Sequence, residues 1–134
     1  MPQFPIQKRT KIWQVTAADT DETTAIFSVK AGERVLWASV LPLVSASAST
    51  SSTIIVGDGT DNDGYLTSTA WDPEAAALGT YISGDGALFA LSGGKLYTVD
   101  DTIDVIYSAV AAGDTGGIEK RPKARIAIGV VRAA

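Results

Sequence analysis

Residues 57–64 read Gly-Asp-Gly-Thr-Asp-Asn-Asp-Gly and lie between two short apolar runs, 53–56 and 65–67. Glycine, asparagine and aspartate tolerate the backbone conformations of tight turns, whereas short runs rich in β-branched and aromatic residues are typical of strands. The same alternation of turn and short run continues through residues 93–98 and 102–107. This middle part of the chain therefore predicts a small antiparallel β domain.

The pattern extends outward to both ends of the chain. Residues 102–107 and 124–131 place alternate apolar side chains on one face, as expected for strands with one buried face. Further strand candidates are residues 12–15, 24–29, 34–44, 53–56, 65–67, 87–91 and 95–98. With about eight short strands between turns, the expected fold is an all-β antiparallel sandwich, with a jelly roll as the natural candidate.

The longest apolar run, residues 34–44, alternates only weakly. Such a strand is either covered on both faces or bent, and Pro42 is the place for a bend. Because Trp37 lies in this run, we expect its side chain in the core. One short loop helix is predicted after Trp71, because Asp72 is a good N-cap, Pro73 suits the first helical position and Gly79 suits the end.

Length and composition indicate one domain. A chain of 134 residues with 46% hydrophobic and 19% charged residues can bury a core without disulfides or a structural metal. Pro2 and Pro5 predict an extended N-terminal arm over residues 1–11, followed by a single β-sandwich domain over residues 12–134. The start lacks the apolar segment of a secretory signal. The uncharged run 35–57 is rich in Ser and Thr, which argues against a membrane span.

Charge is segregated along the chain, whose formal net charge is -4. Between Val35 and Glu119 the only basic residue is Lys95, and the acidic residues dominate. Most of the positive charge lies near the two ends, at Lys8, Arg9, Lys11, Lys120, Arg121, Lys123 and Arg125. If the fold brings the ends together, they form one basic patch on an acidic molecule; if not, they are two ordinary solvated clusters.

The residue types present exclude several kinds of chemistry. The chain has no His and no Cys, which excludes a Ser-His-Asp hydrolase, disulfides and thiolate metal sites. The glycine-rich turns lack the lysine of a phosphate loop. Neighbouring carboxylates such as Asp100 and Asp101 could act as acid and base in glycoside cleavage, but solvated pairs at strand ends are common. We expect no enzymatic activity and no cofactor.

Asp58, Asp61 and Asp63 are the candidate ligands for a hard cation, because Ca²⁺ prefers several oxygen ligands from one loop. The run 61–64 resembles the start of an EF-hand loop, but Tyr65 stands where a third oxygen ligand would be needed. Since Asp, Asn and Gly are also ordinary turn formers, a structural turn without metal is the preferred interpretation.

Aromatic and basic residues suggest binding to surfaces. Trp71, beside the predicted loop helix, is the candidate surface anchor, since aromatic side chains contribute large contact areas. The basic residues are too few for a nucleic-acid-binding protein of this net charge. We therefore expect neither a nucleic acid nor a membrane as partner.

Residues 29–36, 55–66 and 94–105 resemble small virion proteins of tailed bacteriophages. The similarity covers about residues 25 to 130. Among these virion proteins, the chain most resembles the jelly-roll cement, or decoration, proteins of phage heads, such as the Bordetella phage type. It concerns turns and strands, and it supplies no active-site motif that could be carried over to this chain.

The resemblance implies a non-enzymatic protein, made in the host cytoplasm, that binds the outer surface of the capsid in the virion. Its implied partner is the major capsid protein, and a homo-oligomer, dimer or trimer, is implied as well. The residues that we expect to contact the capsid are Phe4, Ile6, Lys8, Arg9, Lys11, Lys120, Arg121, Lys123 and Arg125. The alternative is a tail-fibre or receptor-binding domain that recognises carbohydrate.

Overall fold

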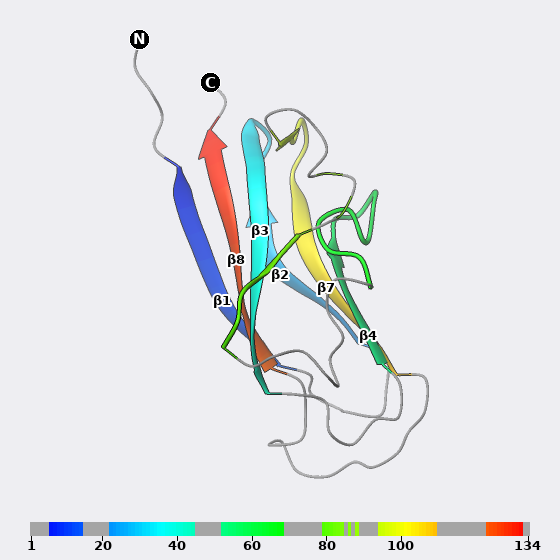
Figure 1. Ribbon diagram of the computed structural model, residues 1–134. Helices are drawn as coiled ribbons and strands as arrows, with labels where there is room; N and C mark the ends of the chain where they lie inside the picture. Colours follow the sequence, from blue (N-terminus) through cyan, green and yellow to red (C-terminus); the bar gives the residue numbers. More distant parts are fainter. Residues whose placement is uncertain are drawn as a thin grey trace.

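The strands of this protein form two antiparallel sheets that face each other (Figure 1). The computed structural model describes residues 6–14, 22–44, 52–68, 79–84, 86, 88, 94–109 and 123–132. The first sheet contains β1 (Gln7–Gln14), β8 (Lys123–Arg132), β3 (Glu33–Val44) and β5 (Ile82–Ser83), in that order, and β6 (Lys95–Leu96) also pairs with β3. The second sheet contains β2 (Glu22–Val29), β7 (Asp101–Ala109) and β4 (Ser52–Gly57).

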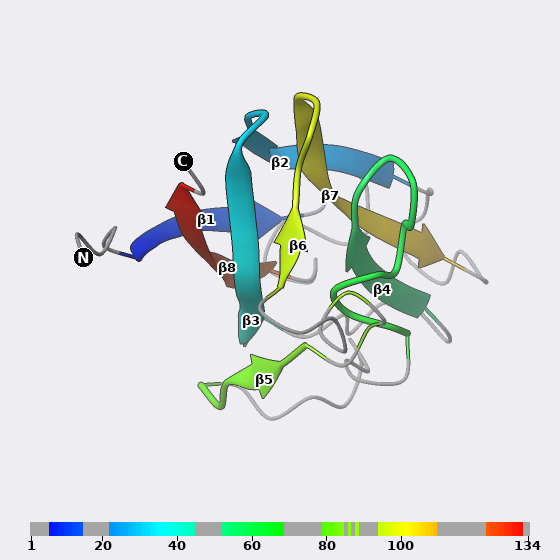
Figure 2. The ribbon, with the colours of Figure 1, turned by 90° about the horizontal axis from the view of Figure 1, so that it is seen from above.

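The connectivity is that of a jelly roll. Strands β1 to β4 alternate between the two sheets, β5 and β6 both belong to the first sheet, and the late strands β7 and β8 insert between earlier ones, giving the orders β1-β8-β3 and β2-β7-β4. Seen from above, β2 and β7 lie on one side of β3, toward the top of the view, and β5 lies on the other side (Figure 2). The predicted all-β sandwich, with its jelly roll of about eight strands, is confirmed.

The core lies between the sheets and follows the period of two expected for strands. On β7 the side chains of Ile103, Val105 and Tyr107 are fully buried, and on β8 those of Ile126 and Ile128 are as well. Burial of such side chains contributes roughly 1.5–3 kcal/mol each, so this shared interior is the main stabilising term.

The irregular pairing of β3 explains why apolar and polar residues alternate only weakly in its sequence. Its pairing with β8 shifts register between Val35 and Trp37 and again between Pro42 and Val44. Each shift is an irregularity of the β-bulge type, which changes the side of the sheet to which the following residues point. Val35 and Val40 are buried in the core, whereas Trp37 lies on the opposite face and is only partly buried. The expectation that Trp37 belongs to the core is therefore wrong.

The structure bears on two further expectations. Residues 7–11, expected in an extended arm over residues 1–11, are part of β1 and pair with β8. Of the expected strand 95–98, residues 95–96 form β6 and pair with Arg34 and Val35 of β3. The predicted loop helix at 72–79 lies outside the described residues, as do residues 1–5 of the arm.

Candidate functional site

The pairing of β1 with β8 joins the two basic ends of the chain. The two strands are antiparallel over their length, from Gln7 opposite Val130 to Gln14 opposite Lys123. Lys8 thus stands across from Gly129, and Ile12 stands directly across from Arg125. The fold thus brings the two ends of the chain side by side, and of the described basic residues Lys8, Lys123 and Arg125 share one face of the pair.

Lys8, Lys123 and Arg125 belong to the face of the first sheet that is turned away from the second sheet, here called the outer face. Residues opposite each other in an antiparallel pair point to the same side. Because Ala124, Ile126, Ile128 and Val130 of β8 face the core, the residues that alternate with them point outward. The outer face accordingly carries Lys8, Ile12, Trp37, Leu41, Lys123 and Arg125. None of its described residues is acidic.

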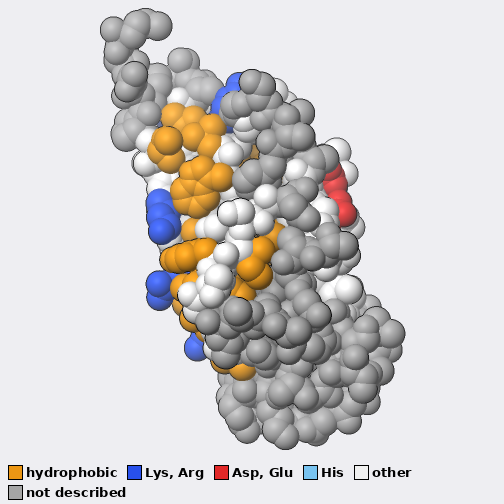
Figure 3. Space-filling view, viewed as in Figure 1, with side chains coloured by type: hydrophobic (Ala, Val, Ile, Leu, Met, Phe, Trp, Pro, Cys, Tyr) orange, Lys and Arg blue, Asp and Glu red, His pale blue; other side chains and the backbone are white. Residues whose placement is uncertain are grey.

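The outer face is apolar as well as basic. Ile12 is 47% exposed, and Ile6, just before β1, is 57% exposed. Figure 3 shows hydrophobic side chains gathered over the first sheet, with Lys and Arg side chains along its edge and the visible Asp and Glu side chains away from it. Exposed hydrophobic patches of this kind mark interaction surfaces more often than scattered single residues do.

Trp37 and Gly129 form the centre of this face. The two residues are opposite each other on β3 and β8. A Cβ placed on Gly129 would lie 2.3 Å from Nε1 and Cε2 of Trp37, so the indole occupies the space above the glycine. A strand glycine often marks such a close approach. The neighbouring small residue on β8, Ala127, is buried.

Arg9 has a different role from its basic neighbours. It stands opposite Ile128, on the inner side of β1. Its guanidinium forms an ion pair with Glu33 through two nitrogens, and it also donates a hydrogen bond of 3.0 Å to the carbonyl oxygen of Ser28. Burial raises the pKa of Glu33, but the hydrogen bonds from Arg9 and from the Lys30 amide outweigh burial, and the pKa is lowered. Arg9 therefore connects β1 to the end of β2 and the start of β3.

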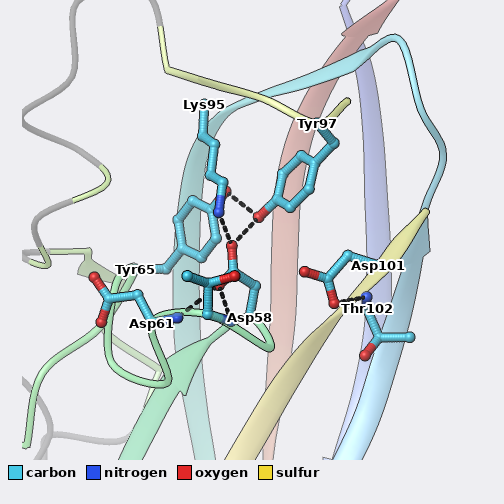
Figure 4. A network of polar contacts seen from close by, with 8 residues as sticks. Asp58, Asp61, Tyr65, Lys95, Tyr97, Asp101 and Thr102 are labelled. Carbon is cyan, nitrogen blue, oxygen red and sulfur yellow. Dashed lines mark hydrogen bonds and ion pairs between the residues drawn. The ribbon is translucent and has the colours of Figure 1, made fainter. Parts of the chain in front are cut away.

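Asp58, predicted as a weak candidate for a cation site, is the acceptor of a buried polar network (Figure 4). One carboxylate oxygen accepts the backbone amides of Thr60 and Asp61, at 2.9 and 2.8 Å. The other accepts the ammonium of Lys95 and the hydroxyl of Tyr97, the latter at 2.7 Å. Both oxygens of Asp58 are thus occupied by donors from the protein.

The network continues from Tyr97 to Tyr65. Because Tyr97 donates its proton to Asp58, Tyr65 is the donor in the 2.8 Å contact between the two hydroxyls. Burial raises the pKa of Tyr65 and of Tyr97, so both stay protonated. For Asp58, burial raises the pKa, but the bonds from Lys95, Asp61 and Tyr97 outweigh it and lower the pKa below its ordinary value. The network is a satisfied structural link between β4, β6 and the 58–65 turn.

Asp61 and Asp63 do not join Asp58 in a ligand set. The hydrogen bond between the Asp61 and Asp63 side chains raises the pKa of Asp61, and Asp58 is engaged as above. Over the part of the chain that the structure describes, no group of three acidic, His or Cys side chains is arranged to hold a metal ion. Within the same part, no helix is long and apolar enough to cross a membrane.

The predicted capsid contacts are only partly visible. Lys8 and Arg125 are exposed, and Lys123 is half-buried. Lys11 is exposed too, but it stands opposite Ile126 and so lies on the inner side of β1. Phe4, Trp71, Lys120 and Arg121 lie outside the described residues. The sequence analysis did not identify Ile12, Trp37 and Leu41 as surface residues. For Trp37 and Leu41, the weak alternation of residues 34–44 was the available signal.

The fold is that of a jelly-roll β-sandwich, and two solved capsid structures contain chains that are similar to it. A chain of the cyanophage Pam1 capsid asymmetric unit matches with a TM-score of 0.67 and 12% identity, covering 96% of this chain and 86% of that one. A chain of the acidic stable capsid of Helicobacter pylori bacteriophage KHP30 matches with a TM-score of 0.58 and 11% identity, covering 97% and 95%. At these identities the likeness is one of fold.

Sequence comparisons add no relative. No protein-family model matches the chain, and no curated protein matches it at a significant level.

Proposed function

We propose that this chain is a non-enzymatic structural protein of a bacteriophage virion. It acts as a decoration, or cement, protein that binds the outer surface of the capsid lattice and stabilises contacts between major capsid protein subunits. The observation that carries the proposal is the fold, which is similar over almost the whole chain to chains of two phage capsids. The Bordetella-type resemblance of the sequence points in the same direction.

The chemistry of the described residues supports a binding role. Both carboxylate oxygens of the buried Asp58 accept hydrogen bonds from within the protein. The exposed outer face, in contrast, combines cations with apolar side chains, as protein interfaces do. A dimer or trimer of such a domain would gain avidity on a symmetric lattice, because weak contacts repeat in register.

Within this function, residues 2–11 and 120–125 are proposed to contact the major capsid protein. Deleting residues 2–11 would remove five residues of β1 and so test folding as well as binding. Deletion of residues 2–5 leaves β1 whole and is the sharper test of the arm. Loss of capsid binding with unchanged thermal unfolding supports the arm contact, and full retention of binding refutes it.

The function itself is tested by adding the purified protein to expanded capsids that lack it and imaging them by cryo-electron microscopy. Ordered density at symmetric positions on the outside of the shell is the expected result. Bare shells at micromolar protein concentration would refute the cement role.

One observation favours the alternative of a tail-fibre or receptor-binding domain. Tyr81, just before β5, is 56% exposed, and an exposed aromatic ring can stack on a sugar. A glycan array separates the two functions, because a cement protein should give no specific glycan signal. A thermal-shift assay with Ca²⁺ adds a second readout, since occupied Asp58 oxygens leave little reason for calcium to stabilise the fold.

A further inference from the structure

The two outer faces of the sandwich differ in charge. The second sheet, formed by β2, β7 and β4, contains no Lys or Arg in any of its strands. Half of its outward residues bear hydroxyls, Ile55 and Ile106 are apolar, and Asp104 is the charged residue among them. The outer face of the first sheet has Lys8, Lys123 and Arg125 and no described acidic residue. A chain of net charge -4 thus presents one locally basic face.

We infer that the outer face of the first sheet, centred on Trp37 and Gly129, docks flat against an acidic protein surface. This inference rests on the proposed function, under which that surface belongs to the capsid shell, and it names the face and the chemistry of the contact. Positive side chains flanking an apolar centre select a partner with carboxylates around an apolar patch, because complementary potentials steer encounter and fix register.

The geometry suits a flat contact. Trp37 lies over Gly129 because residue 129 has no side chain, and Ala127 beside it is small and buried. The middle of the face therefore has no long side chain standing on β8 between residues 127 and 129. Ile12 rises at one side, directly opposite Arg125. An apolar residue and a cation side by side supply both the buried area and the charge of one interface.

The same charges argue against a second copy as the occupant. A two-fold contact is self-complementary, so each copy would present the same patch to the other. Two outer faces pressed together would bring Lys8, Lys123 and Arg125 against their own equivalents, and like charges at an interface disfavour association. An acidic partner removes this repulsion.

Arg125→Glu and Lys30→Glu form a matched pair of variants for the test. Each replaces a cation by an anion and changes the net charge from -4 to -6. Arg125 is an exposed residue of the outer face, whereas Lys30 is in the β2–β3 turn with a side chain that is 63% exposed. Ile12→Asp, at the residue opposite Arg125, tests the apolar part of the proposed contact. Circular dichroism and thermal unfolding confirm that each variant folds.

Binding to expanded capsids is measured at several salt concentrations. We expect Arg125→Glu and Ile12→Asp to weaken binding at least about tenfold, and Lys30→Glu to bind within about twofold of the wild type. Raising the salt should weaken wild-type binding. If the wild type binds and Arg125→Glu binds equally well, the inference is overturned while the proposed function stands.

A second probe separates failure of the inference from failure of the function. Immobilised poly-L-glutamate offers carboxylates without any capsid. Low-salt retention of the wild type and of Lys30→Glu, with loss for Arg125→Glu, supports the inference even if capsids are not bound. Absence of wild-type retention, or equal retention of Arg125→Glu, overturns it. Self-association in sedimentation that Arg125→Glu abolishes would also overturn it, in favour of a second copy.

Discussion

The indole of Trp37 on β3 lies over Gly129 on β8, in the space that a Cβ on residue 129 would need. This contact crosses from one strand to the next on the exposed side of the first sheet. Residue 129 is therefore restricted to glycine by a side chain that is distant in the sequence.

Gly129→Ala should destabilise the fold by about 1–3 kcal/mol, because the new methyl group must displace the indole. In a strand without such a neighbour, Ala is favoured over Gly by roughly 0.5–1 kcal/mol. The effect should therefore vanish or reverse in a Trp37→Ala background. Urea unfolding of the four proteins of this double-mutant cycle measures the coupling. Equal effects of Gly129→Ala in both backgrounds would contradict the contact.

Asp58→Asn should destabilise the protein by about 3 kcal/mol, because Lys95 loses its buried counter-charge and one side of the network loses its acceptor. Asp61→Asn is the matched control in the same turn, since its amide nitrogen, not its carboxylate, takes part in the bond to Asp58. Urea denaturation gives both values. A similar loss for the two variants would mean that turn formation, and not the network, determines the cost.

Stability should decrease in acid. Folding lowers the pKa of Asp58 and of Glu33, so the unfolded chain binds more protons than the folded one in the range where these groups titrate. Their contribution is complete above the unfolded pKa values, at about pH 4 to 5, and is lost as the pH falls through the lower folded values. Thermal unfolding between pH 7 and pH 3 measures the slope. Glu33→Gln should flatten it, and an unchanged slope in this variant would refute the assignment.

Arg9→Leu should destabilise the protein by about 1–3 kcal/mol, because its charged hydrogen bonds to Glu33 and Ser28 are lost. Lys8→Leu is the control, since Lys8 is the neighbouring residue but points to the outer face. Hydrogen exchange should show lower protection of the β1 amides in Arg9→Leu alone. Conversely, binding to capsids should depend on Lys8 more than on Arg9 once folding is accounted for.

Much of the fold could be predicted because the residues of β7 and β8 that face the core are apolar at every second position. The basic residues near both ends raised the hypothesis that the two ends of the chain lie together. The register of β1 with β8 could be known only from the structure. Strand β3 resisted prediction for a physical reason. Its bulge after Val35 breaks the period of two, and apolar side chains such as Trp37 and Leu41 lie on its exposed side.

The candidate site was harder to predict than the fold. Arg9 and Lys8 are adjacent basic residues, and only the pairing of β1 shows that one points inward to Glu33 and the other outward. Asp58 looked like one of three equivalent turn carboxylates, yet its partners Lys95 and Tyr97 are 37 and 39 residues away. Long-range partners of this kind leave no local pattern in the sequence.

The strand order also has a consequence for how the chain reaches its native state. The middle strand of the second sheet is β7, and the strand between β1 and β3 is β8, so both sheets receive their centres from the last strands of the described chain. On a ribosome, residues 7–57 can be complete while β1, β2, β3 and β4 still lack the neighbours with which they pair. Pairing that joins distant segments is slow, and uncovered strand edges are prone to aggregation. The nascent protein therefore depends on rapid completion of its C-terminal third, and synonymous codons that stall translation before residue 101 should lower its soluble yield.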